Sequence, residues 1–191
     1  MNWERSKVYS LIFGFIPQQP VPERLFDPAL GGGSLLDIGI YNVFLVLSIL
    51  GRPDTIEASM TASHEGVDIQ CASLFKYKSG AMAQFFSSLS SNLGTDADIS
   101  GDKSRVRLTA RFYAPSATIE LYAGRENTRE IIPVHKEGGS GYQYEARHVG
   151  ECLRRGLTES PVMSLDDSLL IMETLDRIRS AAGIHYSADR F

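Results

Sequence analysis

Three consecutive strand-length segments constrain this chain more than any other feature of its sequence. Thr55–Ala62, Asp68–Tyr77 and Ala81–Leu89 each show a repeat of two, and Lys78-Ser79-Gly80 between the last two is typical of a hairpin loop. The three segments therefore predict an antiparallel meander. Shorter strand candidates lie at residues 8–16, 97–101, 105–110, 117–122 and 130–134.

Two helices are predicted in the C-terminal third. The first covers Tyr142–Gly156, and the second begins after Ser164, with Asp167 completing a capping box, and ends at Gly183. The side chains expected to be buried on the first helix are Ala146, Val149 and Cys152 or Leu153. Those expected on the second are Leu165, Leu169, Met172, Leu175, Ile178 and Ala182.

The central strands of the predicted sheet are apolar on both faces. Cys71, Ser73 and Phe75 share one face, and Ala72 and Leu74 share the other. A lone sheet with helices on one face should be polar on its other face. We therefore expect the second face to be covered, and the sequence predicts a homodimer formed through it.

Length and charge limit the classes of function. The 191 residues suffice for one domain, residues 1–191, with a sizeable core. Nineteen Lys and Arg against 23 Asp and Glu give a net charge of −4, so the chain lacks the basic excess needed to bind nucleic acid or an anionic membrane surface. The longest apolar region, Leu35–Leu50, contains polar residues and is shorter than a membrane span.

Cysteine and histidine usage gives no sign of a disulfide scaffold or a metal site. Cys71 and Cys152 are too few for such a scaffold and match no C-x-x-C pattern, which favours a reduced, cytoplasmic setting. The histidines show no spacing of three or four residues to another ligand, so no metal is expected. They are His64, His135, His148 and His185.

Three successive glycines precede another predicted helix. Gly31, Gly32 and Gly33 place bare backbone at a helix N-terminus, where a flat ring or an anionic group can approach closely. The alternative is a flexible turn. The segment is not a Walker loop, because it lacks Gly-Lys-Ser/Thr. It is not a dinucleotide fingerprint either, because Leu36 stands where that fingerprint requires Gly or Ala.

The helix after these glycines carries the candidate catalytic residues. We expect Ser34 to be its N-cap, with Asp37 in a variant capping box, and Gly51 to end it. Asp37 and Tyr41 lie four residues apart, so their Cβ atoms should lie about 5–6 Å apart on one face. Asp37 either orients Tyr41 or only stabilises the helix N-terminus. Tyr41 either transfers a proton or is a core residue with a bonded hydroxyl.

A tyrosine with a pKa near 10 is protonated at neutral pH, so it donates a proton to a forming alkoxide but is a poor base. Alcohol oxidation would require a lower pKa, for which a nearby cation is the usual device. No lysine lies near Tyr41 in the sequence. Arg24 either reaches an anionic group of a ligand or forms a surface ion pair, and Tyr142 lies either at a pocket edge or in an exposed loop.

Two segments of the sequence resemble one enzyme family. Residues 31–41, Gly-Gly-Gly-Ser-Leu-Leu-Asp-Ile-Gly-Ile-Tyr, are similar to a segment of the glucose–fructose oxidoreductase, inositol dehydrogenase and MocA family. Residues 141–149 and 159–162 resemble a later segment of the same family. The similarity extends from Val8 to Tyr186. Within the family it is strongest to the dimeric dihydrodiol dehydrogenases and the NADP-dependent D-xylose dehydrogenases.

The resemblance implies an α+β fold. It implies a large, mostly antiparallel open β-sheet with helices packed on one face, like the C-terminal domain of glyceraldehyde-3-phosphate dehydrogenase. In this family such a domain binds the substrate and often dimerises, while a Rossmann domain binds NAD or NADP. The sequence resembles only the first domain, since the Rossmann glycines and the family's Glu-Lys-Pro lysine have no counterpart. We therefore expect no NAD or NADP to bind to this chain alone.

The resemblance also implies roles for individual residues. Asp37 and Tyr41 match the carboxylate and the proton-donating residue of the family's active site. The glycine run would approach the nicotinamide, and Arg24 and Tyr142 are candidates for substrate binding. The expected function is the substrate-binding and dimerisation domain of an NAD(P)-dependent oxidoreductase that acts on a sugar, polyol or cyclic diol by hydride transfer. The alternative is a non-enzymatic dimerisation or ligand-binding module with the same sheet.

Overall fold

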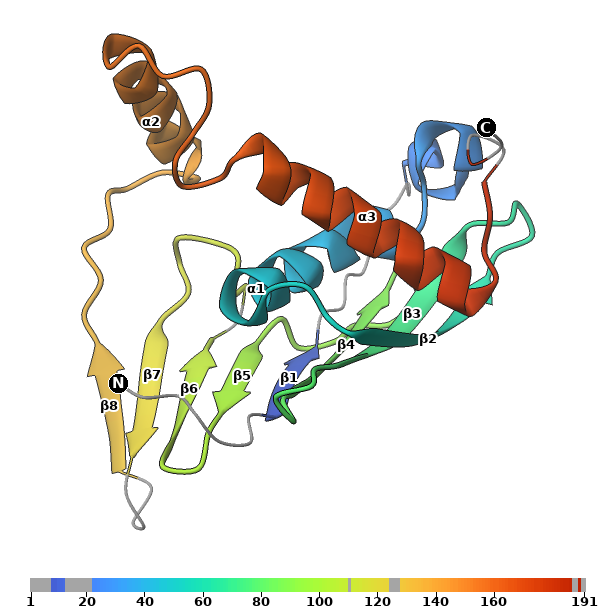
Figure 1. The fold of residues 1–191 in the computed structure, drawn as a ribbon, viewed down its shortest axis with the longest axis horizontal. Coiled ribbons are helices and arrows are strands. Elements are labelled where there is room, and N and C mark those ends of the chain that lie inside the picture. Colours follow the sequence, from blue (N-terminus) through green and yellow to red (C-terminus); the bar gives the residue numbers. More distant parts are fainter. Residues whose placement is uncertain (1–7, 13–21, 110, 124–127, 187–188, 190–191) are drawn as a thin grey trace.

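The fold is an open sheet of eight strands, seen in a computed structural model that describes residues 8–12, 22–109, 111–123, 128–186 and 189. The strand order is β2-β3-β4-β1-β5-β6-β7-β8 (Figure 1), and neighbours are antiparallel except for parallel β1 and β4. The bounds are β1 Val8–Ile12, β2 Thr55–Ala62, β3 Asp68–Lys76, β4 Met82–Ser88, β5 Ala97–Ser100, β6 Ser104–Leu108, β7 Ile119–Ala123 and β8 Thr128–Ile132.

Two helices cover one face of this sheet. α1 (Ile40–Leu50) and α3 (Leu165–Ala182) contact each other there, and α3 also contacts β2 (Figure 1). α2 (Tyr142–Arg154) lies apart from them, at the end of the molecule away from β2. A π-helical turn, Leu35–Gly39, leads into α1, and two 3-10 turns, Glu23–Phe26 and Pro28–Leu30, lie upstream.

The core lies between the sheet and these two helices. The rings of Phe75 on β3 and Phe85 on β4 meet edge to face, with centroids 5.6 Å apart. Both belong to a buried apolar cluster in which α1 contributes Val43 and Val46 and α3 contributes Leu175 and Ile178. The sheet and helix pattern confirms the expected α+β class and the mostly antiparallel open sheet.

The antiparallel meander is confirmed. β2, β3 and β4 pair in sequence order, and Gly80 has a φ of +84° in the hairpin between the last two. The shorter strands also exist, with ends shifted by one or two residues from the predicted bounds. The strand predicted at residues 8–16 is β1 as far as Ile12, while its remainder and residue 110 lie outside the described residues.

The capping box at the start of α3 is confirmed. Ser164 Oγ accepts a hydrogen bond from the Asp167 N–H at 3.0 Å, and Asp167 Oδ2 accepts one from the Ser164 N–H at 2.9 Å. Gly183 ends the helix in the left-handed conformation. Each end of α3 is fixed by residues within one helical turn of it, so the local sequence is enough to predict both ends.

The predicted buried stripes are partly wrong. On α3, Leu175 and Ile178 are buried as expected, but Leu165, Leu169 and Met172 are exposed. Ile171 and Thr174 are buried instead, so the contact of α3 with α1 and β2 follows a stripe displaced from the predicted one. On α2 only Cys152 is buried, and Ala146, Val149 and Leu153 are exposed, because α2 lies away from the sheet.

The face of the sheet opposite the helices changes character along its width. Over β3 and β4 it carries Ala72 and Leu74, which alternate with the core residues of β3, as predicted, together with Met82 and Phe86. Over β5–β8 the same face is charged. Ion pairs join Arg105 to Asp98, Arg107 to Asp96 and Arg129 to Glu120.

One helical region is apolar and long enough for a membrane span by length and composition. It covers Pro28–Leu50, 23 residues, which is longer than the apolar region identified in the sequence. Its side chains Leu35, Val43 and Val46 are buried against the sheet and α3. This segment therefore serves as the core helix of the fold.

Candidate active site

The glycine run before α1 is packed against the rest of the protein. Gly32 and Gly33 are buried, whereas Gly31 is exposed. A Cβ on Gly33 would lie 2.3 Å from Asp68 Oδ1, and a Cβ on Gly32 would lie 2.7 Å from the Leu25 carbonyl oxygen. Gly33 also has a φ of +108°, which favours glycine. Internal packing thus explains two of the three glycines, and the expected contact with a nicotinamide stays a prediction.

A buried carboxylate from β3 fixes the start of the helical segment. Oδ2 of Asp68 accepts a hydrogen bond from the Ser34 hydroxyl at 2.6 Å and another from the Leu35 N–H at 2.8 Å. The capping box predicted for Ser34 is therefore wrong, because Ser34 has helical dihedral angles and its hydroxyl is used by Asp68. A partner on a distant strand leaves no signal in local spacing.

The environment of Asp68 is closed to solvent. Burial raises the pKa of its carboxyl, and the hydrogen bonds from Ser34 and Leu35 act in the opposite direction. Tyr186 lies at the same place, and its hydroxyl donates a hydrogen bond to the Gly32 carbonyl at 2.7 Å. The glycine loop is thereby held from β3 and from the C-terminal segment.

Asp37 lies in the π-helical turn that precedes α1. Its Oδ1 is 2.7 Å from Nη1 of Arg24, and the carboxylate is largely covered while the arginine side chain is 60% exposed. Solvent screening keeps the energetic contribution of such a pair small. The structure places Arg24 in an ion pair beside the candidate site, and its contact with a substrate stays a prediction.

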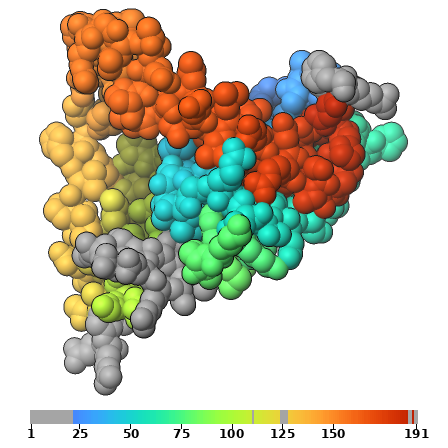
Figure 2. Space-filling view, viewed as in Figure 1, coloured from blue at the N-terminus to red at the C-terminus, as the bar shows by residue number. Residues whose placement is uncertain are grey.

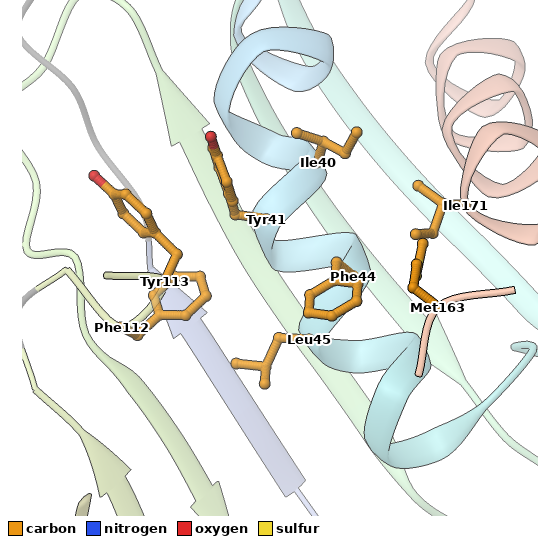
Figure 3. Close-up of a pocket in the computed structure, with 8 residues that line it drawn as sticks. All are labelled: Ile40, Tyr41, Phe44, Leu45, Phe112, Tyr113, Met163 and Ile171. Atoms are coloured by element: carbon orange, nitrogen blue, oxygen red, sulfur yellow. The ribbon is translucent and has the colours of Figure 1, made fainter. Parts of the chain in front are cut away.

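Tyr41 lies on α1 with its ring at the surface of a cavity. The side chain is 40% exposed, and its ring stacks on Tyr113 with centroids 4.7 Å apart (Figure 3). Partial burial raises the pKa of the Tyr41 hydroxyl, and the charges of Tyr113 and Asp37 raise it further. Tyr41 is therefore protonated at neutral pH, and its hydroxyl is not sealed in the core.

Asp37 and Tyr41 interact electrostatically across the junction between the π-helical turn and α1. The charge on Asp37 is one cause of the raised pKa of Tyr41, so the structure brings the two predicted residues together. π-helical turns are found frequently at functional sites. Whether Asp37 and Tyr41 act in catalysis stays a prediction.

Two cavities meet at Tyr41. The first has a volume of about 460 Å³ and is enclosed by apolar and aromatic side chains of α1, α3 and the loop after β6 (Figure 3). Its lining residues are Ile40, Tyr41, Phe44, Leu45, Phe112, Tyr113, Met163 and Ile171. This composition suits the hydrophobic faces of a ring rather than a charged group.

The second cavity is larger, about 780 Å³, and more polar. It shares Tyr41, Phe112 and Tyr113 with the first and extends to the start of α2, where Tyr142 is highly exposed at its edge. This position agrees with the pocket-edge alternative for Tyr142. Its cationic lining residues are Arg111 and Lys136, with Glu145 as a carboxylate and His135 as an imidazole.

The sequence analysis missed the residues that complete the cavity walls. Phe112 and Tyr113 follow β6, and Arg111 before them has a φ of +61°, in the left-handed region. Adjacent aromatic side chains in a loop are a signal for a binding surface. The sequence alone could not show that they line the same cavity as Tyr41, because the loop after β6 and α1 are distant in sequence and meet only in the folded chain.

The histidines form no metal site among the residues that the structure describes, where no group of three or more metal-ligating side chains occurs. One pairing was overlooked in the sequence. His148 and Cys152 lie four residues apart on α2, with Nε2 and Sγ at 3.5 Å, and His148 also contacts Ser160 Oγ at 2.8 Å.

Comparison with known proteins identifies the family of this fold. The family model described as the GFO/IDH/MocA C-terminal domain matches residues 8–107. The chain therefore belongs to the GFO/IDH/MocA C-terminal domain family, which confirms the resemblance found in the sequence.

Relatives and solved structures add two kinds of enzyme to this comparison. Trans-1,2-dihydrobenzene-1,2-diol dehydrogenase from Homo sapiens is 34% identical over 173 residues, covering 87% of this chain and 51% of that enzyme. The same enzyme from Mus musculus is 38% identical over 174 residues, with the same coverage. The crystal structure of aldose-aldose oxidoreductase from Caulobacter crescentus, complexed with glycerol, has a TM-score of 0.78 at 24% identity. It covers 92% of this chain and 53% of that one.

The chain spans about half the length of the curated relatives it matches. A 3-ketoreductase from Actinomadura kijaniata, in complex with NADP and TDP-benzene, shows the same proportion. It has a TM-score of 0.75 at 20% identity and covers 91% of this chain and 53% of that one. The remaining half of each such protein has no counterpart in the matched residues.

Substituting Asn for Asp68 should change how stability depends on pH. Because the pKa of Asp68 is raised above 3.8, the folded chain holds this proton more tightly than the unfolded chain. The stabilisation from protonated Asp68 is therefore fully present below pH 3.8, and it is lost as the pH rises through the raised pKa of Asp68. We expect the free energy of unfolding of the wild type, minus that of Asp68→Asn, to decrease from about pH 4 to pH 7. Urea unfolding at several pH values measures this difference, and a pH-independent value would contradict it.

Proposed function

We propose that this chain is the substrate-binding and dimerisation part of an NAD(P)-dependent oxidoreductase that acts on a sugar, a polyol or a cyclic diol. The observation that carries the proposal is the placement of Tyr41. Its phenol is partly exposed on two adjoining cavities and interacts with Asp37. A protonated hydroxyl at the wall of a ring-sized cavity is suited to donate a proton to a substrate oxygen.

Tyr41 would handle the proton of the reaction. In the reducing direction a carbonyl carbon receives a hydride while its oxygen takes the proton of the Tyr41 hydroxyl, which gives an alcohol and a tyrosinate. The tyrosinate regains a proton from solvent, which reaches the partly exposed side chain. The raised pKa of Tyr41 keeps its hydroxyl protonated at neutral pH, so the proton for donation is present and the tyrosinate that could abstract a proton is scarce.

Asp37 would act as a positioning residue for Tyr41. It occupies the helical turn before Tyr41, and Arg24 holds one of its oxygens at 2.7 Å. A carboxylate fixed in this way keeps a negative charge close to the phenol, which holds Tyr41 in its protonated, donor form at neutral pH. Arg24 in turn acts on the reaction through Asp37, unless a substrate displaces it from the ion pair.

The two cavities suit a substrate with a ring and hydroxyl groups. The apolar cavity offers aromatic and aliphatic side chains to a ring face, and the larger cavity offers cationic and hydroxyl-bearing side chains to polar substituents. The matched relatives are named for a cyclic diol, and the Caulobacter structure is named for aldoses. Both substrate classes fit such a site, with Tyr142 at its edge.

The hydride must be supplied by a nicotinamide cofactor, NADP or NAD, since side chains do not carry that chemistry. The described residues do not fit the phosphates of such a cofactor. The Leu25 carbonyl and the Asp68 carboxylate pack directly against Gly32 and Gly33, so a phosphate has no space there. The Gly31–Gly33 run leads into a π-helical turn and does not form a dinucleotide fingerprint. Most of the dinucleotide must therefore be held by polypeptide outside these residues.

Dimerisation is proposed for the face of the sheet opposite the helices. Ala72, Leu74, Met82 and Phe86 lie there on β3 and β4. Gln84 and the Glu57–Lys76 ion pair flank Leu74 on the same face, and the charged strands β5–β8 border this region. A mixture of apolar and polar side chains is the usual composition of a non-obligate protein interface. A cytoplasmic location and the absence of nucleic-acid and membrane partners remain predictions from composition.

The Tyr41→Phe substitution tests the catalytic part of this proposal. It is best made in a fusion protein that joins this chain to the half of the human relative that the chain does not match. We expect turnover of a cyclic ketone with NADPH to fall at least about 10²-fold, because the group that donates the proton to the forming alcohol is lost. Tyr122→Phe, on the face of the sheet opposite the cavities, is the matched control and should stay within about twofold. Equal turnover of the wild type and Tyr41→Phe would remove Tyr41 from the mechanism.

Calorimetric titration of NADPH and NADH into the isolated chain tests the assignment of the cofactor site. We expect no heat of binding at micromolar protein, because no phosphate site is formed by the glycine run. A dissociation constant near about 1 μM, typical of a built site worth about 8 kcal/mol, would show that the chain binds the cofactor by itself. The non-enzymatic alternative predicts no turnover in the fusion protein either.

Leu74→Glu tests the proposed dimer face. A second carboxylate beside Glu57 on this face would be left unpaired and desolvated under a partner, so association should weaken by roughly 2–5 kcal/mol. Sedimentation velocity should show a dimer for the wild type at micromolar concentration and a monomer for Leu74→Glu. Circular dichroism checks that the variant folds. A wild-type monomer at that concentration would refute the dimer.

A further inference from the structure

The larger cavity beside Tyr41 contains two cationic side chains that the proposed chemistry does not use. Arg111 lies in the loop after β6, and Lys136 lies in the segment that joins β8 to α2. Figure 2 shows that this end of the molecule, where α2 projects from the body, is open to solvent. Within the described residues the Arg111 guanidinium has no ion-pair or hydrogen-bond partner, whereas Arg105 and Arg107 on β6 are both ion-paired. An unpaired guanidinium that lines a cavity is available to a negatively charged ligand.

The backbone fixes Arg111 at this cavity. Its φ of +61° lies in the left-handed region, and no other non-glycine residue among those that the structure describes has such a value. The Arg111 N–H donates a hydrogen bond to Thr95 Oγ1 at 2.6 Å, and the Phe112 N–H donates one to the Thr95 carbonyl at 3.0 Å. The Arg111 carbonyl accepts a third from the Ala114 N–H at 2.7 Å. Backbone held in a rarely populated conformation is concentrated at ligand sites.

Lys136 reaches the same cavity through a contact with the neighbouring loop. Its ammonium group donates a hydrogen bond to the carbonyl oxygen of Ala117, which also lines the cavity. An ammonium group has three N–H donors, so two remain for a ligand. The lining contains one carboxylate, Glu145, and the imidazole of His135. With histidine counted as neutral at pH 7, two cations against one carboxylate leave one positive charge in excess.

We propose that Arg111 and Lys136 bind a carboxylate of the substrate, which makes the substrate a cyclic acid or a sugar acid. This inference rests on the proposed function and specifies its substrate class. A planar guanidinium donates two parallel hydrogen bonds to the two oxygens of a carboxylate. One excess positive charge matches the single negative charge of a carboxylate, whereas a phosphate monoester carries about −1.5 to −2 at pH 7.

The position of the Tyr41 hydroxyl between the cavities fits a substrate of this kind. In Figure 3 the hydroxyl oxygens of Tyr41 and Tyr113 point the same way, away from Leu45 and Met163. Leu45 and Met163 line the apolar cavity and not the larger one. A ring can therefore face the apolar cavity with its reacting oxygen at the Tyr41 hydroxyl, while a carboxylate on the same side of the ring turns toward the cations.

The two cations do not act on the Tyr41 phenol. The pKa of Tyr41 is raised by burial first and then by the charges of Tyr113 and Asp37, and no positive charge lowers it. A cation that adjusted the phenol for catalysis would lower this pKa. Arg111 and Lys136 are therefore left for a substituent of the ligand, at a distance from the reacting oxygen.

The phosphates of a nicotinamide cofactor are the competing ligand for these cations. The cations line the same cavity as Tyr41, where the substrate oxygen must come within hydrogen-bond reach of the phenol. An anion bound in that cavity is therefore more readily part of the substrate than of the cofactor. Competition with NADPH distinguishes the two ligands.

Binding of two matched probes to the isolated chain tests this assignment. They are 3-oxocyclohexanecarboxylate and its neutral amide, 3-oxocyclohexanecarboxamide. We expect the carboxylate to bind at least about tenfold more tightly in an NMR shift titration at pH 7, equivalent to about 1.4 kcal/mol. Arg111→Gln should reduce this preference to within about twofold, because it removes the charge and keeps an unbranched side chain at the left-handed position. Lys103→Gln removes an exposed positive charge from the turn between β5 and β6 and, as the control, should leave the preference unchanged.

Turnover of the same probes by the fusion protein with NADPH keeps this inference apart from the proposed function. A carboxylate preference in binding without turnover supports the carboxylate site and contradicts the oxidoreductase. Turnover without a preference in kcat/KM overturns the carboxylate site alone, as does a preference that survives Arg111→Gln. Displacement of the carboxylate by NADPH, or tighter binding of 3-oxocyclohexyl phosphate, also overturns it, because the cations would then bind phosphate. Circular dichroism checks the fold of each variant, and Lys136→Gln, which should also lower the preference, replaces Arg111→Gln if that variant unfolds.

Discussion

The hydrogen bonds that Asp68 accepts determine where the candidate site lies. They join the first residue of β3 to the first turn of the helical segment, so the register of the sheet sets the position of Asp37 and Tyr41. Keeping a carboxyl in a buried position is costly, and its raised pKa reflects that cost. The close approach is possible only because Gly33 has no side chain, which makes the glycine run a structural requirement before any question of ligand binding.

The sheet separates two kinds of surface. One face receives α1 and α3 and, at its margin, the cavities beside Tyr41, while the other carries mixed apolar and polar side chains over β3 and β4 and ion pairs over β5–β8. Because the faces point in opposite directions, contacts on one do not compete for space with contacts on the other. Such a layout allows one partner to close the cavities and another to bind the sheet.

Local patterns predicted most of the elements but fewer of their contacts. The strands, the hairpin at Gly80 and the Ser164 cap depend on residues close in sequence, and these predictions are confirmed. The Ser34 cap failed because its real partner lies 34 residues away on β3. Likewise, Asp37 and Tyr41 could be singled out from their spacing, whereas Tyr113 could not, because its stacking on Tyr41 depends on how β6 and α1 meet across the sheet.

The proton chemistry of Tyr41 also links this chain to polypeptide beyond it. Among the described residues its surroundings raise its pKa, since burial and the charge on Asp37 both favour the neutral phenol, and Arg24 is already paired with Asp37. Such a phenol is ready to protonate an oxygen during carbonyl reduction. Alcohol oxidation needs the opposite, a phenol whose ionisation is favoured by a nearby positive charge. For that direction the charge must come from a group brought to the cavity rim, so the ionisation of Tyr41 depends on what docks there.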